Sequence, residues 1–509
     1  MALLMMRYVA VDLGAESGRV IAGTLTDGRV ALEEVYRFAN APVRTPDGLH
    51  WDVLRLYDEV LTGLAAVAGR YGRAVDGIGV DAWGVDYGLL DAGGRLLGNP
   101  YHYRDARTDG LPEEAARIVP ASEQYARTGI AQLPINTIYQ LMALARGGDR
   151  SAEHATSLLM IPDLLHYWLT GERAAEYTEA TTTGALGVEG AWATDLLARL
   201  GIPAHMLLPP VQPGATLGSL HPSVRAACGL DAVPVILPAA HDTASAVVAT
   251  PARPRLDTAD GWATHAYISS GTWSLLGLEL DRPILGDEAR RAGFTNEGGV
   301  GGTYRFLTNI MGLWLVQECR RAWARAGRDW GYEEMTARAA EIPSPGVVID
   351  ANDPTFLHPA DMPTAVRAYL ARTNQRAVDE PVALVRAILE GLALAYRVAI
   401  DEAERLSGQR VDMIHVIGGG ARNGLLCQLA ADACRRPVLA GPAEATALGN
   451  VLVQAMGSGA LRDLADVRAV ACASAHVTTF EPRMRGNWDD RRGQLRAFQA
   501  CRETGCVGR

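Results

Sequence analysis

The chain has 509 residues, of which 48% are hydrophobic, so it is long enough for two or three domains with ample cores. Its formal net charge is −10 and it contains no basic run, which argues against nucleic acid or an anionic membrane as a partner. The N-terminal apolar run, residues 1–6, is too short for a signal-peptide core or a membrane span. Seven scattered cysteines without metal-ligand spacing indicate reduced thiols in a cytosol.

The sequence contains no lysine, so all 48 of its lysine-plus-arginine positions are arginine. P-loop NTPases, protein kinases and Schiff-base enzymes each require a lysine at their site. The composition therefore excludes these three classes. Any phosphate bound by this chain would be neutralised by arginine, by backbone amides and by a metal ion.

The N-terminal residues predict a β-hairpin, because residues 10–23 form two apolar strands around a small polar tip. A strand over 28–36, a loop over 42–50 and a helix over 51–70 are predicted next, the helix from its apolar spacing. Strands over 75–80 and 87–90 follow, with a turn at 91–94. The alternation of strands and helices from there indicates an α/β domain.

Residues 266–277 repeat the pattern of the first hairpin, with Ser269-Ser270-Gly271-Thr272 at the tip. A tip without bulky side chains lets backbone N–H groups approach an anion, and two facing tips would hold a polyphosphate between two lobes. One such turn alone is more often only a turn. Its repetition indicates a duplicated nucleotide-binding fold. The polar residues 251–261, with two prolines, predict a boundary that divides the chain into 1–250 and 251–509.

The second half predicts a helix over 382–406, a buried strand over 411–417 and a helix over 424–434. Gly418, Gly419 and Gly420 connect the last two. Glycines there leave room for a flat ligand, and the following helix N-terminus favours anions. Because the pattern is not GxGxxG, a plain strand-to-helix turn is the alternative.

A polar trio, His241, Asp242 and Thr243, follows the predicted strand 233–237, where α/β sheets place reactive groups. Asp242 could cap a helix, but that role leaves its two neighbours unexplained. Its carboxylate could instead accept the proton of a sugar hydroxyl during phosphoryl transfer. Aromatic, Asp and Arg residues over 80–87 and 101–107 suit a sugar site, or else form core aromatics with surface ion pairs. No GxSxG elbow of a hydrolase is present.

Several motifs resemble those of FGGY-type carbohydrate kinases, which belong to the actin-like ATPase superfamily. They are DLGAESGR, DAWGVDYGLL, YRDARTDG, EYTEATTTG, HDTASAV, SSGTWSLLG, TNEGGVGGTYRFLTNIMGLW and GGGARN, and the resemblance covers roughly residues 7 to 460. It implies an α/β fold of two actin-like (ribonuclease H-like) ATPase domains around a central cleft. The domain over 1–250 would bind mainly the sugar, and the domain over 251–509 mainly ATP.

HDTASAV and the TNEGG–NIMGLW block further resemble the members of that family that act on L-rhamnulose. The implied reaction is transfer of phosphate from ATP to the 1-hydroxyl of L-rhamnulose, or of a similar ketose, with Mg²⁺ as cofactor. Asp242 matches the proton acceptor. The matching substrate contacts are Gly84, His241, Asp242, Thr243 and Asn309. The matching ATP contacts are Ala15, Glu16, Ser17, Gly18, Arg19, Thr272, Gln317 and Gly419, and Asp12 matches the acid near the metal–phosphate cluster.

Two residues of the first tip leave alternatives open. Glu16 departs from the family pattern, and its carboxylate would repel phosphate unless it points outward or helps to hold Mg²⁺ through water. Arg19 is either an auxiliary cation or part of a surface ion pair. The competing functions are a related kinase for L-fuculose or xylulose and a non-catalytic actin-like nucleotide-binding protein. The Trp/Tyr-rich first half and the polar trio argue against the latter.

Overall fold

The computed structural model describes residues 5–147, 151–252, 264–328, 330–357, 359–483 and 486–503. The chain forms two compact units that are not continuous in sequence. The first unit comprises Met1–Pro251, Glu279–Phe306 and Ala445–Ala475, and the second comprises Ala252–Leu278, Leu307–Glu444 and His476–Arg509. Most of the predicted boundary segment, from residue 253 on, lies outside the described residues. The division into a sugar domain over 1–250 and an ATP domain over 251–509 stays a prediction.

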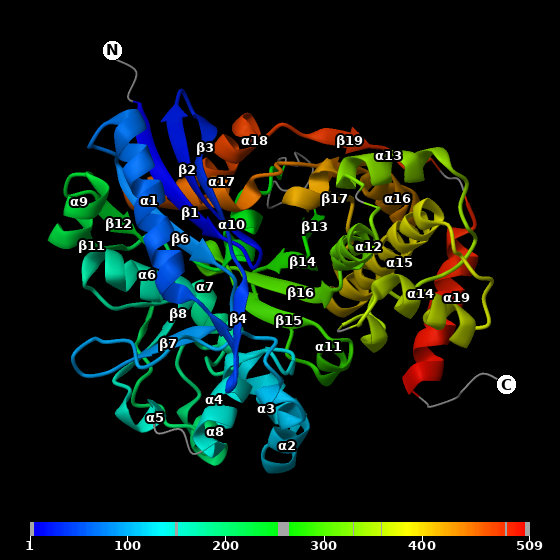
Figure 1. Cartoon of the computed structure of the whole chain (residues 1–509), viewed down its shortest axis with the longest axis horizontal. Helices are drawn as coiled ribbons and strands as arrows, with labels where there is room; N and C mark the ends of the chain where they lie inside the picture. Colours follow the sequence, from blue (N-terminus) through cyan, green and yellow to red (C-terminus); the bar gives the residue numbers. More distant parts are fainter. Residues whose placement is uncertain are drawn as a thin grey trace. The chain divides into compact units, whose positions relative to one another are not determined.

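The first unit is built on a six-stranded sheet with the strand order β11-β12-β6-β1-β2-β3 (Figure 1). Its strands are β1 (Met6–Leu13), β2 (Ser17–Thr26), β3 (Arg29–Ala39), β6 (Gly77–Ala82), β11 (Thr216–Ser219) and β12 (Pro234–Ile236). β1, β2 and β3 are antiparallel neighbours, whereas β6 runs parallel to both β1 and β12. The predicted hairpin and the strands after it are confirmed.

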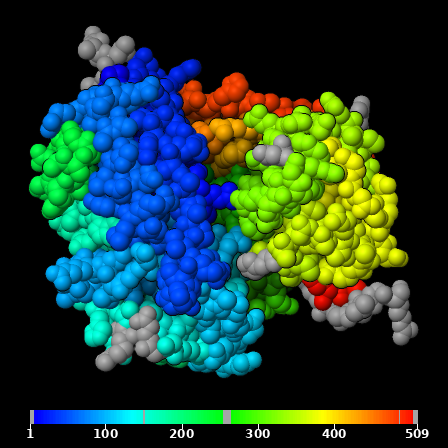
Figure 2. Space-filling view, viewed as in Figure 1, coloured from blue at the N-terminus to red at the C-terminus, as the bar shows by residue number. Residues whose placement is uncertain are grey.

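Helices cover both faces of this sheet. Side chains alternate between the two faces of β1, so Val9, Val11 and Leu13 point to the same face. There they form one hydrophobic core with α1 (Val53–Tyr71), α6 (Ile161–Thr170) and α9 (Pro222–Cys228). Helix α1, which the sequence predicted, is amphipathic, and Figure 2 shows it (blue) at the surface of the first unit. The opposite face of the sheet carries α10 (Asp242–Val248) and α17 (Ala445–Gly457), and α18 (Leu464–Ser474) packs beside them.

The predicted loop over 42–50 is wrong, because β4 (Pro42–Thr45) and β5 (Gly48–Trp51) pair as a hairpin. Two prolines and Asp47-Gly48 concealed it, since these residues also occur in plain loops. β7 (Tyr87–Leu90), predicted from the sequence, pairs with β8 (Ser157–Met160). The smaller elements of the unit are α2 (Leu111–Ile118), α3 (Ala121–Thr128), α4 (Thr137–Arg146), α5 (Ser151–His154), β9 (Ala175–Glu176), α7 (Tyr177–Ala180), α8 (Thr194–Arg199), β10 (Pro210–Val211), α11 (Asp287–Arg291) and β15 (Thr295–Gly298).

The second unit repeats the topology of the first. Its strands follow the order β16-β14-β13-β17-β18-β19, so an antiparallel hairpin, β13–β14, again has a parallel strand, β17, beside its first strand. The bounds are β13 (His265–Ser270), β14 (Ser274–Leu280), β16 (Tyr304–Ile310), β17 (Met413–Ile417), β18 (Val438–Ala440) and β19 (Thr478–Phe480). The ends Glu279–Leu280 of β14 and Tyr304–Phe306 of β16 belong to the first unit. The second hairpin is confirmed, and the shared topology supports a duplicated fold.

The helices of the second unit are α12 (Trp314–Arg325), α13 (Tyr332–Glu341), α14 (Met362–Arg372), α15 (Pro381–Ser407), α16 (Gly424–Cys434) and α19 (Trp488–Glu503). The prediction of α15 is confirmed. Glu380 caps its start by accepting a hydrogen bond from the backbone of Ala383, and Gly408, with φ 71°, ends it in the left-handed conformation. Among the described residues, no helix combines the length and the apolar character that crossing a bilayer requires.

Candidate active site

Three carboxylates of the first unit lie where neighbouring parallel chain segments end. Asp12, near the end of β1, pairs in register with Asp81, near the end of β6. The residue after Asp81, Ala82, donates a backbone hydrogen bond to Ala240 (2.9 Å) and forms a parallel bridge with His241. Asp242 follows directly. The carboxyl ends of parallel strands are where α/β folds bind ligands, so this edge is the first candidate for the site.

Asp81 is the most buried of the three. Burial, followed by the charges of Asp12 and Asp242, raises its pKa well above the usual range of an aspartate. Its Oδ2 accepts a hydrogen bond from the Asn450 amide of α17 (2.5 Å), whereas its buried Oδ1 has no hydrogen-bond partner. Asp12 forms an ion pair with Arg19 of β2. The arrangement thus places three carboxyl groups at one edge, and one of them, Asp12, is paired with an arginine.

The tip of the first hairpin is tight, and a residue outside the hairpin, Asn40, holds it. Gly14 N–H bonds Ser17 O (2.9 Å), and the Asn40 amide donates to Gly14 O (2.9 Å). A Cβ at Gly18 would lie 2.2 Å from the Phe38 ring, so packing requires glycine there. Ala15 and Ser17 are half-buried, and Glu16 is exposed. Arg19 is partly buried and forms an ion pair with Asp12.

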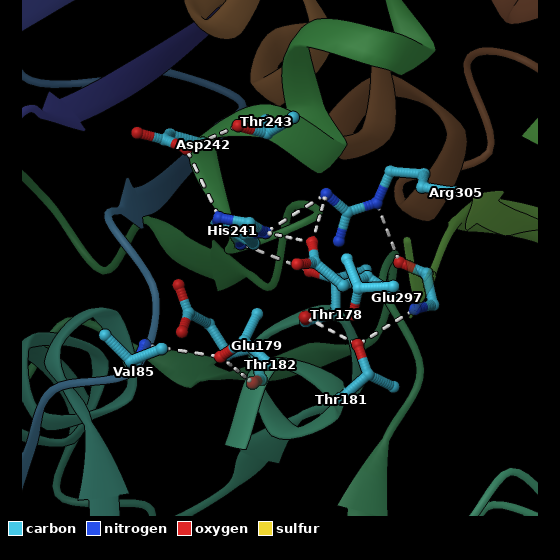
Figure 3. A network of polar contacts seen from close by, with 12 residues as sticks. Val85, Thr178, Glu179, Thr181, Thr182, His241, Asp242, Thr243, Glu297 and Arg305 are labelled. Atoms are coloured by element: carbon cyan, nitrogen blue, oxygen red, sulfur yellow. Dashed lines mark hydrogen bonds and ion pairs between the residues drawn. The ribbon is translucent and has the colours of Figure 1, made fainter. Parts of the chain in front are cut away.

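The polar trio stands at the start of α10 (Figure 3). Thr243 Oγ1 donates a hydrogen bond to Asp242 Oδ1 (3.1 Å), and His241 Nε2 lies 3.5 Å from the same oxygen. The Asp242 side chain is 31% exposed, whereas that of His241 is 9% exposed. Asp242 is thus a carboxylate accessible to a ligand, held in place by both of its neighbours.

A buried glutamate ties the chain before His241 to β9 and α7. Glu176 Oε2 accepts hydrogen bonds from Thr178 Oγ1 (2.6 Å), Glu179 N (3.0 Å) and Ala240 N (3.2 Å). Thr178 Oγ1 in turn accepts from His241 N (3.1 Å). Burial raises the pKa of Glu176 to about 7, although these hydrogen bonds oppose the shift.

Gly84 belongs to a loop whose next residue is strained. Val85 has φ 70°, a conformation that β-branched residues rarely adopt. Its N–H donates to Thr182 Oγ1 (3.2 Å), and its carbonyl accepts from Thr137 Oγ1 (2.7 Å) and Gln140 Nε2 (3.2 Å). A Cβ at Gly84 would lie 3.0 Å from Thr182 Oγ1. The surrounding structure therefore fixes the backbone of this loop.

The aromatic residues near Gly84 are core residues. Trp51 and Trp83 pack with ring centroids 4.1 Å apart, and both indole N–H groups donate to the buried Asp86 (2.6 and 3.1 Å). Trp83 is only 6% exposed. Of the two interpretations of this motif, packing describes these tryptophans better than an open sugar-stacking surface does.

In the second unit, predicted ATP contacts gather at the end of β13. Thr272 O accepts a hydrogen bond from Trp314 N (3.1 Å), at the start of the helix that carries Gln317. The buried Gln317 Oε1 has no hydrogen-bond partner. The glycine turn also packs against the end of β13. A Cβ at Gly420, next to Gly419, would lie 2.0 Å from Ser270 Oγ, so only glycine fits this turn. Asn309 lies on β16 and is half-buried.

Comparison with known proteins identifies the family. Residues 7–249 match the N-terminal domain of the FGGY family of carbohydrate kinases, and residues 266–458 match its C-terminal domain. The chain belongs to the FGGY family of carbohydrate kinases. The predicted resemblance is thereby confirmed, and this FGGY kinase is an ATP-dependent sugar kinase.

Curated relatives of this FGGY kinase include two named rhamnulokinase. The protein of Bacteroides thetaiotaomicron is 41% identical over 95% of this chain and 97% of its own length. That of Pectobacterium carotovorum is 42% identical over 97% of this chain and 96% of its own length.

Solved FGGY-type structures confirm the predicted fold class. A gluconate kinase of Lactobacillus acidophilus has a TM-score of 0.78 at 16% identity, with 98% of each chain covered. A glycerol kinase of Plasmodium falciparum with ADP has a TM-score of 0.75 at 14% identity, with 99% of each chain covered.

The carboxylates of this FGGY kinase fit a divalent metal that arrives with a nucleotide. Mg²⁺ usually keeps several waters and is bound by one or two carboxylates together with substrate phosphates. Asp12 and Asp81 are neighbours in register, and Asp81 Oδ1 has no partner. Across the described ranges, no cluster of three or more His, Cys, Asp or Glu residues could hold a metal alone. Kinases of this family use ATP with a divalent metal in general.

Four polar residues near the candidate site carried no predicted role: Asp81, Glu176, Glu297 and Arg305. The last two, on β15 and β16, contact His241. All four lie inside the motifs that signalled the family, DAWGVDYGLL, EYTEATTTG and TNEGGVGGTYRF. Their motif positions were the signal that could have found them. Their partners lie 60 or more residues away in sequence for most of these contacts, which no local pattern reveals.

Proposed function

We propose that this FGGY kinase transfers the γ-phosphoryl group of ATP to the 1-hydroxyl of L-rhamnulose, giving L-rhamnulose 1-phosphate. The observation that carries the proposal is the 41–42% identity to rhamnulokinases over 95–97% of the chain. The polar trio at the strand end supports it, because a kinase of this kind needs a proton acceptor beside the acceptor hydroxyl.

Asp242 is the proton acceptor in this proposal. Thr243 donates to Oδ1 and His241 lies beside the same oxygen, so Oδ2 is assigned to the substrate hydroxyl. As the hydroxyl oxygen attacks the γ-phosphorus, its proton moves to Asp242. Gly84, His241, Thr243 and Asn309 are assigned to the remaining sugar contacts. Because the strained Val85 loop is fixed by three hydrogen bonds, Gly84 presents its backbone to the sugar with little reorganisation.

The ATP contacts are assigned as follows. Those of the first unit are Ala15, Glu16, Ser17, Gly18 and Arg19 at the first hairpin tip, and those of the second unit are Thr272, Gln317 and Gly419. Asp12 and Asp81 would hold Mg²⁺, which when bound neutralises phosphate charge and orients the transferring group. Arg19, paired with Asp12, keeps the orientation of that carboxylate and contributes a positive charge in a chain without lysine.

A ketose panel tests the proposal. The chain is incubated with ATP, Mg²⁺ and L-rhamnulose, L-fuculose or xylulose, and ADP release is followed by a coupled assay. We expect the highest kcat/KM for L-rhamnulose and a loss of at least about 100-fold in kcat for Asp242→Asn, the range of a lost general base. Asp231→Asn, at an exposed ion pair with Arg73, is the matched control and should keep full activity.

The other outcomes separate the alternatives. Faster turnover of another ketose would replace L-rhamnulose as the substrate. A loss below about tenfold for Asp242→Asn would remove that residue as general base. ADP release that no ketose stimulates would favour a nucleotide-regulated binding protein.

A further inference from the structure

A buried ion pair lies behind His241, on the side of the ring away from Asp242 (Figure 3). Arg305 of β16 is fully buried, and its Nη1 lies 3.0 Å from Glu297 Oε2 of β15. The same Nη1 is hydrogen-bonded to His241 Nδ1 (3.1 Å), and Arg305 Nε donates to Gly298 O (3.1 Å). These contacts hold the Arg305 guanidinium against the His241 ring.

The hydrogen bond between Arg305 and His241 fixes where the ring carries its hydrogen. A guanidinium group has only N–H donors, so Nδ1 of His241 must accept. A neutral imidazole that accepts at Nδ1 carries its hydrogen on Nε2. Nε2 is the atom that lies 3.5 Å from Asp242 Oδ1, so the ring presents a donor to that carboxylate.

Glu297 by itself would favour the opposite arrangement. Its Oε2 lies 3.3 Å from His241 Nδ1 and can only accept while ionised. Burial acts to raise the pKa of Glu297, but its surroundings, above all the charge of Arg305, outweigh burial and hold that pKa below the usual range. The ionised Glu297 neutralises Arg305, and Arg305 is the closer of the two to Nδ1. Arg305 therefore decides the state of the ring, and removing it would leave Glu297 to pull a hydrogen onto Nδ1.

We propose that Arg305 is a positioning residue that sets the tautomer of His241, so that Asp242 is the only proton acceptor of the polar trio. An imidazole with a bare Nε2 would be a stronger base than an aspartate and would compete for the proton. With its hydrogen on Nε2, His241 instead donates toward Oδ1 of Asp242. The hydroxyl proton goes to Asp242, the oxygen–phosphorus bond forms, and ADP leaves with the electron pair of the broken bond.

This inference rests on the proposed role of Asp242, but its decisive measurement needs no substrate. NMR of the full chain labelled at histidine reports the tautomer of each ring, and His241→Asn identifies the signal of position 241. We expect the Nε2–H form at neutral pH in the parent protein and in Arg305→Lys, which keeps a donor. Arg305→Met should shift the ring to the Nδ1–H form. It should lower kcat by at least about tenfold, because a ring with a bare Nε2 no longer donates to Asp242 and competes with it for the proton.

A matched control separates tautomer control from simple loss of a buried arginine. Arg491 of α19 is also buried and paired with a glutamate, Glu390 (2.9 Å). Arg491→Met should lower thermal stability without changing the signal of His241. An Nδ1–H ring in the parent protein, or an unchanged Nε2–H ring in Arg305→Met, would overturn the inference. If Arg305→Met does not fold, the parent protein and Arg305→Lys still decide it.

Failure of the proposed function gives a different result. A chain that prefers another ketose, or none, would contradict the substrate assignment while leaving the tautomer measured at position 241 intact. Conversely, a wrong tautomer would not alter which sugar the coupled assay detects.

Discussion

Glu176 is a single buried residue that makes the backbone of the candidate site sensitive to pH. It collects three hydrogen bonds on one oxygen and so fixes the backbone before His241. Its other oxygen is buried without a partner, which makes the charged form costly. The carboxyl group of Glu176 therefore stays protonated in the folded protein at pH values at which it would be ionised in the unfolded chain.

We expect Glu176→Gln to flatten part of the pH dependence of stability. The pKa of Glu176 is raised from 4.5 to about 7, so between these values the native state binds more protons than the unfolded chain. Stability from this group consequently falls as the pH rises through that window, by about 3 kcal/mol. Urea unfolding at pH 5 and pH 8 should show the variant equal to the parent at pH 5 and relatively more stable at pH 8.

The control for this prediction is Glu113→Gln, at an exposed position of α2. Its unfolding should follow the parent protein at both pH values. Identical pH dependence in Glu176→Gln and the parent protein would show that Glu176 is already charged in the folded state.

At this scale, the sequence predicted the residues whose neighbours are local. His241, Asp242 and Thr243 follow one another after a strand, and the structure places them at its end. Arg305 could not be assigned, because its contact with His241 spans 64 residues and depends on how the strands pair. The left-handed Val85 was equally hidden, since nothing in the residue type favours that conformation.

At the scale of elements, the contact between α10 and α17 positions the sheet edge that forms the candidate site. A Cβ at Gly449 of α17 would lie 1.8 Å from Ser245 O of α10, so the two helices meet at their backbones. The next residue, Asn450, donates to Asp81, and Gln454 donates to Val9 O of β1 (3.0 Å). α17 thus holds both the helix that begins at Asp242 and the strand that carries Asp81.

We expect Gly449→Ala to separate α10 from α17. A clash with a backbone atom cannot be relieved by a side-chain rotation, so a loss of about 1–3 kcal/mol or more is expected, together with reduced kinase activity. Gly69 is also a helical glycine, in α1, but no atom lies within 4 Å of its added Cβ. Gly69→Ala should stabilise the chain by about 0.5–1 kcal/mol in the same thermal unfolding assay.

Equal stability of these two glycine variants would contradict the close helix packing.

The elements themselves were largely predictable, because both hairpins, α1 and α15 carry clear periodicity and caps. The β4–β5 hairpin was not, because Pro42 and Pro46 mask its strand pattern. The placement of α17 on the first sheet was not predictable either, since its apolar residues would suit any buried helix.

At the scale of the whole molecule, the first unit is assembled from three separate stretches of chain. Residues 1–250 alone lack α17 and α18, so one face of the β1–β6 sheet would keep only α10 as its cover. We expect the fragment 1–250 to be poorly soluble and to unfold without cooperativity, as measured by circular dichroism during heating. Co-expression with 251–509 should restore soluble material. A sharp thermal transition of the isolated fragment would contradict this view.

The same discontinuity has a consequence during protein synthesis. About 200 residues separate the end of the first stretch at Pro251 from the start of α17 at Ala445. At the usual rate of roughly 5–20 residues per second, the ribosome needs about 10–40 s to make them. Throughout that interval the face of the nascent N-terminal sheet that α17 will cover carries only α10. We therefore expect molecular chaperones to be needed most while residues 251–445 are being made.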